Sequence, residues 1–106
     1  MINARSEFIE HVLGKTVMCA RILKEDFTEE KQEIATLQVG FNEAEYRAFL
    51  DKLNFEYDDG YGTQELLGNI WYRNGTWSER YEYDGSEEWK YKQCPQIPSK
   101  MVPSRE

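Results

Sequence analysis

Few residues in this chain have types that carry out chemistry, and their spacing matches no common catalytic motif. His11 is the only histidine, so a catalytic triad or a histidine-ligated metal would have to be built around it. Its neighbours, Glu10 and Val12, are typical of an ordinary histidine on a helix surface. Cys19 and Cys94 form no Cys-x-x-Cys pair and no zinc-like spacing, so we expect reduced thiols that are buried as small apolar side chains.

One acidic loop copies the spacing of a calcium site. Asn54, Glu56, Asp58 and Glu65 fall at ligand positions of an EF-hand loop. The sixth position of such a loop needs glycine for its sharp turn, and this chain has Asp59 there. We therefore expect no calcium here, and no metal or cofactor elsewhere. Asp58, Asp59 and Glu65 flank two glycines and remain candidates for contact with a partner.

Acid/base chemistry by paired carboxylates is a further option, because four glutamates crowd one stretch: Glu79, Glu82, Glu87 and Glu88. With 20 acidic residues among 106, such crowding also arises by chance. Glu79 is the one of interest, since the register predicted below places it beside Ile70 on the aromatic face. The chain has no Gly-rich phosphate loop, no Gly-x-Ser-x-Gly and no dinucleotide motif. We therefore expect a binding protein rather than an enzyme, although enzymatic activity stays open.

The net charge of −7 is unevenly distributed along the chain. Residues 1–89 hold nine basic and 19 acidic residues, a net charge of −10, whereas residues 90–106 carry +3. A body of this charge repels nucleic acid and attracts basic protein surfaces, although acidic charge also serves solubility alone. The candidate partner-binding residues are Glu25, Asp26, Glu29, Glu30, Glu33, Asp58 and Asp59, together with Trp71 as an aromatic side chain.

Length and composition indicate one folded domain. The chain has 106 residues, of which 40% are hydrophobic and 14% aromatic, so it can form a core. No apolar run reaches the ~18 residues that a membrane span requires. The N-terminal residues do not resemble a secretory signal, and we expect a cytoplasmic protein.

Hydrophobic periodicity predicts two helices. The first covers residues 4–13, with Asn3 as its N-cap and Gly14 ending it in the left-handed conformation. The second runs from Asn42 to about residue 54, where Asn42 and Glu45 match a capping box. Strands are predicted over residues 16–23, 33–39, 66–73, 76–82 and 87–93, with a further short strand near Phe55.

The Asn74-Gly75 pair predicts a two-residue hairpin turn. This turn would set Tyr72 opposite Trp77 and would leave Trp71 on the other face of the sheet.

A three-residue loop over residues 83–85 would then set Arg80 opposite Glu88 and Trp77 opposite Tyr91. The aromatic face would carry Trp77, Tyr81, Trp89 and Tyr91, with Tyr81 covering Gly68.

The predicted fold is α+β: two helices on one face of an antiparallel sheet of four or five strands, in the order α-β-β-α-β-β-β. Residues 1–94 would form the domain, and residues 95–106 a tail with three prolines that cannot extend the sheet.

Four short stretches between Gly62 and Pro98 form a distinctive sequence pattern. It reads Gly-Thr-Gln-Glu-Leu-Leu-Gly-Asn-Ile-Trp, then Asn-Gly-Thr-Trp-Ser-Glu-Arg, Glu-Tyr-Asp-Gly-Ser-Glu-Glu-Trp and Cys-Pro-Gln-Ile-Pro. This pattern resembles one in small uncharacterised proteins of bacteriophages and other mobile elements. The resemblance covers about a third of the chain and implies an accessory protein of the bacterial cytoplasm.

Two functions from different classes follow as expectations. The first is an accessory factor that binds a basic host protein, for example an inhibitor of a defence or nucleic-acid enzyme that imitates nucleic acid with its carboxylates. An anti-CRISPR or anti-restriction factor would be such an inhibitor. The second is a small ligand-binding domain or hydrolase that uses Glu79 in a sheet-lined pocket. The chain could be a monomer or a homodimer joined through the face that carries Trp71. Alternatively, Ile97 and Met101 of the tail could cover Trp71.

Overall fold

The computed structural model describes residues 2–25, 30–57, 65–83, 86–95 and 101. It confirms an α+β fold with two helices and a five-stranded antiparallel sheet, in the strand order β3-β2-β5-β6-β7. Two short strands, β1 and β4, form a separate pair. The elements are β1 Ile2–Asn3, α1 Ala4–His11, β2 Val17–Glu25, β3 Lys31–Leu37, α2 Glu43–Lys52, β4 Glu56–Tyr57, β5 Leu66–Tyr72, β6 Trp77–Tyr83 and β7 Ser86–Lys92.

Both helices begin where their sequences predict, and each ends about two residues earlier than predicted, at His11 and Lys52. Asn42 accepts a hydrogen bond from the Glu45 amide at 2.8 Å, and the Glu45 carboxylate accepts one from the Asn42 amide at 3.2 Å. The ring of Phe41, before this cap, stacks on that of Tyr46 at 5.7 Å. Asn3 caps α1 by accepting from the Ser6 amide, and Gly14 follows α1 with a φ of 77°. These local contacts fix where both helices begin.

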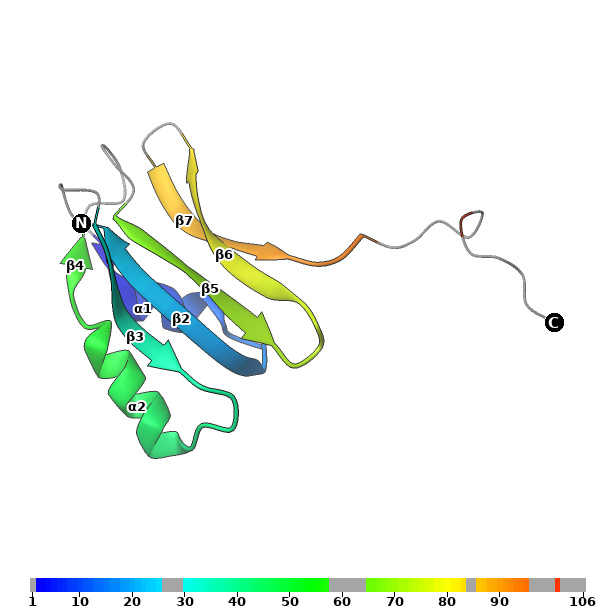
Figure 1. Cartoon of the computed structure of the whole chain (residues 1–106), viewed down its shortest axis with the longest axis horizontal. Helices are drawn as coiled ribbons and strands as arrows, with labels where there is room; N and C mark the ends of the chain where they lie inside the picture. Colours follow the sequence, from blue (N-terminus) through cyan, green and yellow to red (C-terminus); the bar gives the residue numbers. More distant parts are fainter. Residues whose placement is uncertain (1, 26–29, 58–64, 84–85, 96–100, 102–106) are drawn as a thin grey trace.

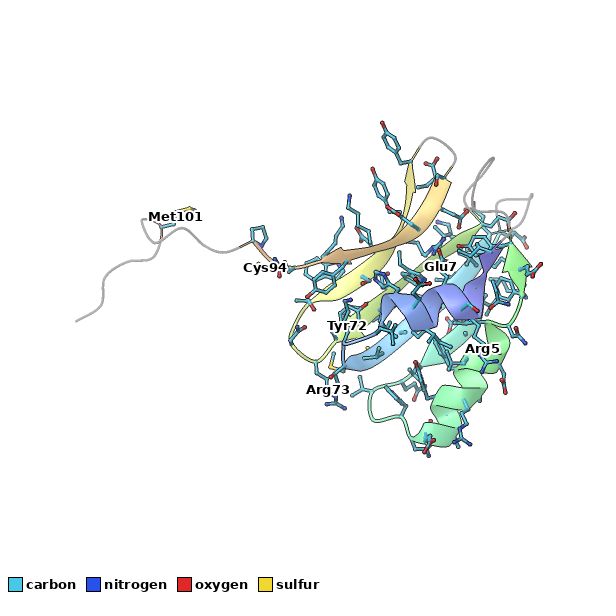
Figure 2. The ribbon with its side chains drawn as sticks, turned by 180° about the vertical axis from the view of Figure 1, so that it is seen from behind. Arg5, Glu7, Tyr72, Arg73, Cys94 and Met101 are labelled. Atoms are coloured by element: carbon cyan, nitrogen blue, oxygen red, sulfur yellow. The ribbon has the colours of Figure 1, made fainter. Side chains whose placement is uncertain are left out.

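Both helices pack on the same face of the sheet, and Figure 2 looks onto that face. Phe8 of α1 is fully buried, and its ring lies edge-on to Phe49 of α2 at 5.2 Å. Below them lie the inward-facing residues of the central strands, among them Ile22 and Ile70. The opposite side of the sheet, called here the open face, carries no helix and is turned toward the reader in Figure 1.

The first predicted hairpin register is wrong by one residue. Trp71 pairs with Trp77 and Asn69 with Glu79, so Tyr72 does not oppose Trp77. The Tyr72 amide donates to the Thr76 carbonyl at 2.9 Å, which leaves three residues in the loop rather than two. Asn74 accepts from the Thr76 amide at 3.0 Å, and Gly75 has a φ of 86°; a three-residue loop needs only that one left-handed residue.

The second predicted register is also wrong by one residue. Tyr83 pairs with Ser86, which leaves a two-residue connection that lies outside the described residues. Arg80 therefore pairs with Trp89 rather than Glu88, and Trp77 with Lys92 rather than Tyr91.

As a result, the two faces of β6 are exchanged relative to the prediction. The faces of β7 are as predicted, because the second error cancels the first. Ser78 and Arg80 face the helices, whereas Trp77, Glu79 and Tyr81 lie on the open face. Trp89 is buried as predicted.

Gly68 is required for a reason other than the predicted cover by Tyr81. Its φ is 144°, and a Cβ atom there would lie 2.2 Å from the backbone oxygen of Arg21. The glycine therefore lets β5 approach β2 closely. Of the predicted tail, the structure describes Pro95 and Met101, and both are exposed. Among the described helices none is long and apolar enough to cross a membrane.

Candidate functional site

Several acidic residues meet at one end of the sheet, where β2 and β6 end and β3, β5 and β7 begin (Figure 1). The Glu25 amide donates to the Glu65 carbonyl at 2.9 Å, and the Glu65 amide donates to the Glu87 carboxylate at 2.8 Å. Glu87 in turn pairs with Glu82 across β6 and β7. We call Glu25, Glu30, Glu65 and Glu82 the acidic end. Glu30 and Glu82 are exposed.

The predicted partner-binding residues divide between this end and other places. Glu25, Glu30 and Glu65 belong to the acidic end, and Glu82 is a member that sequence reasoning missed. Glu33 lies inside β3, where it accepts hydrogen bonds from Thr36 and, at 3.1 Å, from Arg21. These bonds, that of Thr36 first, lower the pKa of the Glu33 carboxyl. Asp26, Glu29, Asp58 and Asp59 lie outside the described residues.

Trp71 lies away from the acidic end, near the other end of β5 on the open face. Its exposed fraction is 39%, and its neighbours across the strands are Cys19 and Trp77. Met101 is 66% exposed, so it does not cover Trp71, and Ile97 lies outside the described residues. The acidic end and the Trp71 side of the open face are thus two surfaces rather than one.

Glu79 also lies on the open face and not on the aromatic face beside Ile70. Its carboxylate forms an ion pair with Lys92 at 2.5 Å. A hollow of about 300 Å³ adjoins it, lined by Leu23, Lys31, Leu67, Gly68, Asn69, Glu79 and Arg80. Glu79 is the only carboxylate among these lining residues, so the hollow offers no acid/base pair.

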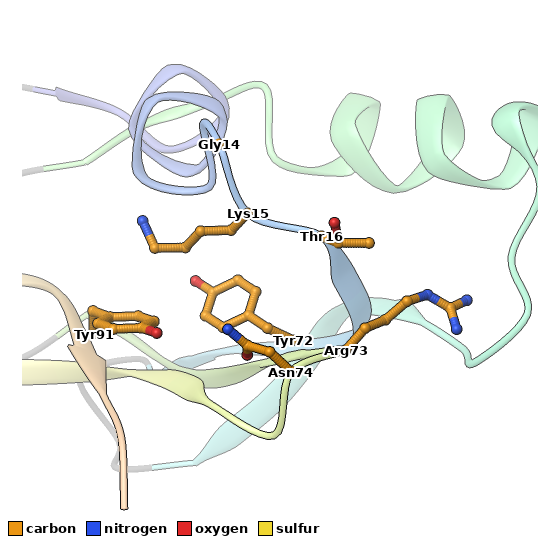
Figure 3. Close-up of a pocket in the computed structure, with 7 residues that line it drawn as sticks. All are labelled: Gly14, Lys15, Thr16, Tyr72, Arg73, Asn74 and Tyr91. Atoms are coloured by element: carbon orange, nitrogen blue, oxygen red, sulfur yellow. The ribbon is translucent and has the colours of Figure 1, made fainter.

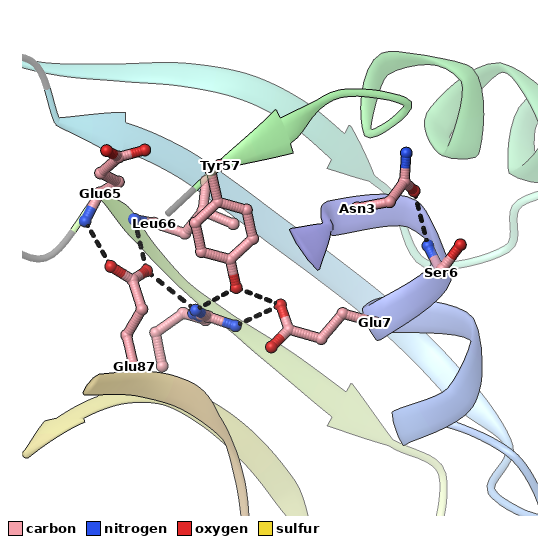
Figure 4. A network of polar contacts seen from close by, with 8 residues as sticks. Asn3, Ser6, Glu7, Tyr57, Glu65, Leu66 and Glu87 are labelled. Atoms are coloured by element: carbon pink, nitrogen blue, oxygen red, sulfur yellow. Dashed lines mark hydrogen bonds and ion pairs between the residues drawn. The ribbon is translucent and has the colours of Figure 1, made fainter. Parts of the chain in front are cut away.

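A buried polar network between α1 and the β6–β7 hairpin was not predicted (Figure 4). Arg80 lies at its centre, with 1% of its side chain exposed. It donates at 2.9 Å to Glu7 of α1, to Glu87 of β7 and to the hydroxyl oxygen of Tyr57 of β4. Tyr57 donates to Glu7. Burial, together with this bond, raises the pKa of the Tyr57 hydroxyl, which stays protonated.

This network takes the place of the backbone ladder between β5 and β6. These strands pair only over Asn69–Trp71, and toward the acidic end they separate. In the gap, the Glu87 carboxylate accepts from the amides of Glu65 and Leu66 at 2.8 and 3.0 Å. Burial alone would lower the pKa of Arg80, but Glu7 and the other partners outweigh it and raise that pKa. The cation and its two carboxylates are therefore structural groups.

His11 has buried partners, contrary to the expected surface histidine. Its Nε2 atom lies 2.7 Å from the Ser78 hydroxyl oxygen, which lies 2.7 Å from the Tyr72 hydroxyl. The imidazole also stacks on Trp89 with a centroid distance of 6.2 Å. Ser78 is completely buried, so this Ser-His pair has no surface at which a substrate could be attacked.

We expect the protein to become less stable as the pH falls from 7.5 to 5.5. Burial, then the nearby charges of Lys15 and Arg80, lower the pKa of His11 in the folded state. Below the ordinary histidine pKa of about 6.5, the unfolded chain therefore binds a proton that the folded chain resists. Urea unfolding followed by tryptophan fluorescence at pH 5.5, 6.5 and 7.5 measures the effect.

The matched control is His11→Gln, which keeps a polar group near Ser78 but does not titrate. Glu7, Glu10 and Glu88, which line a hollow together with His11, are unchanged in this variant. The variant should therefore lose most of the slope. A wild-type protein that is more stable at pH 5.5, or an unchanged slope in the variant, would contradict the assignment.

A hollow of about 540 Å³ lies beside the end of α1 (Figure 3). It is lined by Gly14, Lys15, Thr16, Tyr72, Arg73, Asn74 and Tyr91. Lys15 donates to the His11 carbonyl at 3.1 Å and lies over the Tyr91 ring. Figure 3 shows the Arg73 guanidinium pointing away from the Lys15 ammonium. The two cations therefore do not converge on one anion.

The cysteines are free thiols: Cys19 is half-buried and Cys94 exposed, so the expectation that both are buried is wrong. No group of histidine, cysteine or acidic side chains in the described parts of the chain is arranged to hold a metal ion. Comparisons with protein-family models, with curated proteins and with solved structures find no match.

Proposed function

We propose that this protein is an accessory factor of a phage or other mobile element that binds a basic protein of the bacterial host through its acidic end. The observation that carries the proposal is the gathering of Glu25, Glu30, Glu65 and Glu82 at one end of the sheet. These residues come from four different strands or their flanks, so only the fold brings them together.

The connections 26–29, 58–64 and 84–85 lie outside the described residues, and in the sequence they hold five acidic residues and no lysine or arginine. A dense set of carboxylates attracts the basic surface that a nucleic-acid enzyme uses for phosphates. The proposed action is therefore competitive: the protein occupies a site that nucleic acid would otherwise fill.

The test is capture of a host protein from bacterial lysate, its identification, and titration of the purified pair. Reversal of two exposed charges, Glu30→Lys with Glu82→Lys, should weaken binding at least about tenfold near 0.15 M salt. Higher salt should weaken the wild-type complex and reduce the difference between the proteins. Double-stranded DNA should displace the wild-type protein from its partner.

The matched control reverses two acidic residues at exposed positions on the helices, Glu10→Lys with Asp51→Lys. This variant has the same net charge as the test variant, so a difference between them depends on the position of the charge. Equal binding by the two variants, or a complex indifferent to salt, would disprove binding through the acidic end. A complex that DNA cannot displace would disprove the competitive action.

A further inference from the structure

The open face differs in charge from the rest of this acidic chain. The strand register places four basic residues on it, Arg21, Lys31, Lys90 and Lys92, and four acidic ones, Glu25, Glu33, Glu79 and Glu88. Its formal net charge is therefore zero, whereas the chain carries −7. Two copies of an acidic protein repel each other, and this repulsion is least where two faces of zero net charge meet.

Apolar side chains lie on this face on both sides of a polar row formed by Arg21, Asn69 and Glu79. Trp71, at 39% exposed, stands beside Trp77, and Leu67 stands beside Leu23 in the direction of the acidic end. Ion pairs flank these side chains on both sides: Arg21 with Glu33 at 3.1 Å, and Lys92 with Glu79 at 2.5 Å. Exposed aromatic and apolar side chains next to paired charges are typical of a protein interface.

Each row of residues across the three central strands is complementary to the same row of a second copy that is rotated by a two-fold axis. In one row, Arg21 and Glu79 flank Asn69 on opposite sides. A two-fold axis along β5 exchanges β2 with β6, so it sets Arg21 of one copy opposite Glu79 of the second copy.

In the next row, the sizes of the side chains are complementary across the same axis. Cys19 and Trp77 flank Trp71, and the same axis sets the small Cys19 opposite the large Trp77 of the second copy. Trp71 then meets Trp71 of the second copy, as an isologous interface requires.

We propose that the open face is a homodimer interface, in which two copies pack sheet against sheet about a two-fold axis along β5. Stacked sheets pack with their strands nearly aligned, which keeps these rows opposite each other near the axis. Five strands of about seven residues cover about 550 Å² of each copy, so the dimer is a weak one near the lower size limit of specific interfaces. Both helices lie outside this interface, and of the acidic end only Glu25 is counted on the open face.

Sedimentation equilibrium of the full chain, from about 1 µM to 1 mM, tests the proposal over the range expected for a weak complex. The average mass should rise from 12.6 kDa toward twice that value. Trp71→Asp should abolish the rise. The matched control is Leu13→Asp, at a residue that is 69% exposed beyond the end of α1, and it should leave the association unchanged. Circular dichroism verifies the fold of each variant.

Exchanged charges test the axis itself and do not depend on Trp71. Arg21→Glu and Glu79→Arg should each weaken the dimer about tenfold, because each sets like charges opposite one another. The double variant restores opposite charges across the axis and should recover an affinity close to that of the wild type.

A double variant as weak as the single ones overturns the proposed axis. A mass that stays at 12.6 kDa throughout, or an association indifferent to Trp71→Asp, overturns the interface. A dimer that forms only after residues 94–106 are removed also overturns it, because the tail is then what covers the open face. None of these variants alters the acidic end, so this result and that of the host-protein experiment are independent.

Discussion

Replacing Arg80 with alanine will lower the free energy of unfolding by about 3–5 kcal/mol, because the change leaves buried carboxylates without their cation. Glu87 has 2% of its side chain exposed and Glu7 13%, so water cannot replace the guanidinium. A small domain has about 5–15 kcal/mol of stability in all, so much of the variant should be unfolded by mild urea. Urea unfolding followed by tryptophan fluorescence at pH 7 measures the loss.

The matched control is Arg47→Ala. Arg47 also donates to a glutamate, Glu43, at 2.6 Å, but both side chains are more than 70% exposed. Its removal should cost no more than about 0.5 kcal/mol, as for other surface pairs within a helix. If the two alanine variants lose similar stability, the Arg80 network does not hold the hairpin. Adding Glu87→Gln to Arg80→Ala should recover part of the loss, because it removes one unpaired charge.

Replacing Phe8 with alanine will cost a similar amount, about 3–5 kcal/mol, through loss of packing rather than of charge. The Phe8 ring is fully buried and lies edge-on to Phe49 at 5.2 Å and to Trp89 at 6.2 Å. It thus joins both helices to β7, and its removal leaves a cavity that no single element can close. The midpoint of thermal unfolding, measured by circular dichroism, gives the effect.

The neighbouring Ile9 is the control for Phe8. It is 36% exposed on the same helix, and alanine has the higher helix propensity, so Ile9→Ala should cost less than about 1 kcal/mol. A Phe8→Ala protein as stable as the Ile9→Ala protein would show that the helices are held to the sheet by other contacts.

Features set by neighbouring residues could be predicted from the sequence. The capping box at Asn42, the cap at Asn3 and the left-handed Gly14 each depend on side chains within four positions of one another. The α+β class could also be predicted, because hydrophobic periodicity too is a pattern of residues that lie close together in the sequence.

The hairpin registers could not be predicted with the same success, because one extra or missing loop residue reverses a strand. At the first turn, the bond from the Thr76 amide to Asn74 accompanies a three-residue loop, and Asn-Gly occurs in both loop types. The error moved Glu79 and Trp77 to the wrong face and placed Arg80 on the outside.

The buried network joins residues far apart in sequence, so no local pattern reveals it. One feature of the sequence did point to it. Trp89 is predicted to face inward, and Glu87, two residues earlier in β7, lies on the same face of the strand. An inward glutamate needs a cation, and Arg80 on the adjacent strand supplies it. Similarly, His11 lies one helical turn after Phe8, on the side that faces the sheet.

The separation of β5 from β6 makes the acidic end a two-part surface. Glu25, Glu30 and Glu65 belong to the part built on β2, β3 and β5, whereas Glu82 belongs to the β6–β7 hairpin. Toward this end, hydrogen bonds of the Glu87 side chain join the hairpin to β5, and those of the Arg80 side chain join it to α1 and β4. The distance between the two groups of negative charge is therefore set by buried side-chain bonds rather than by a backbone ladder, so a substitution at Arg80 or Glu87 should also alter the acidic end.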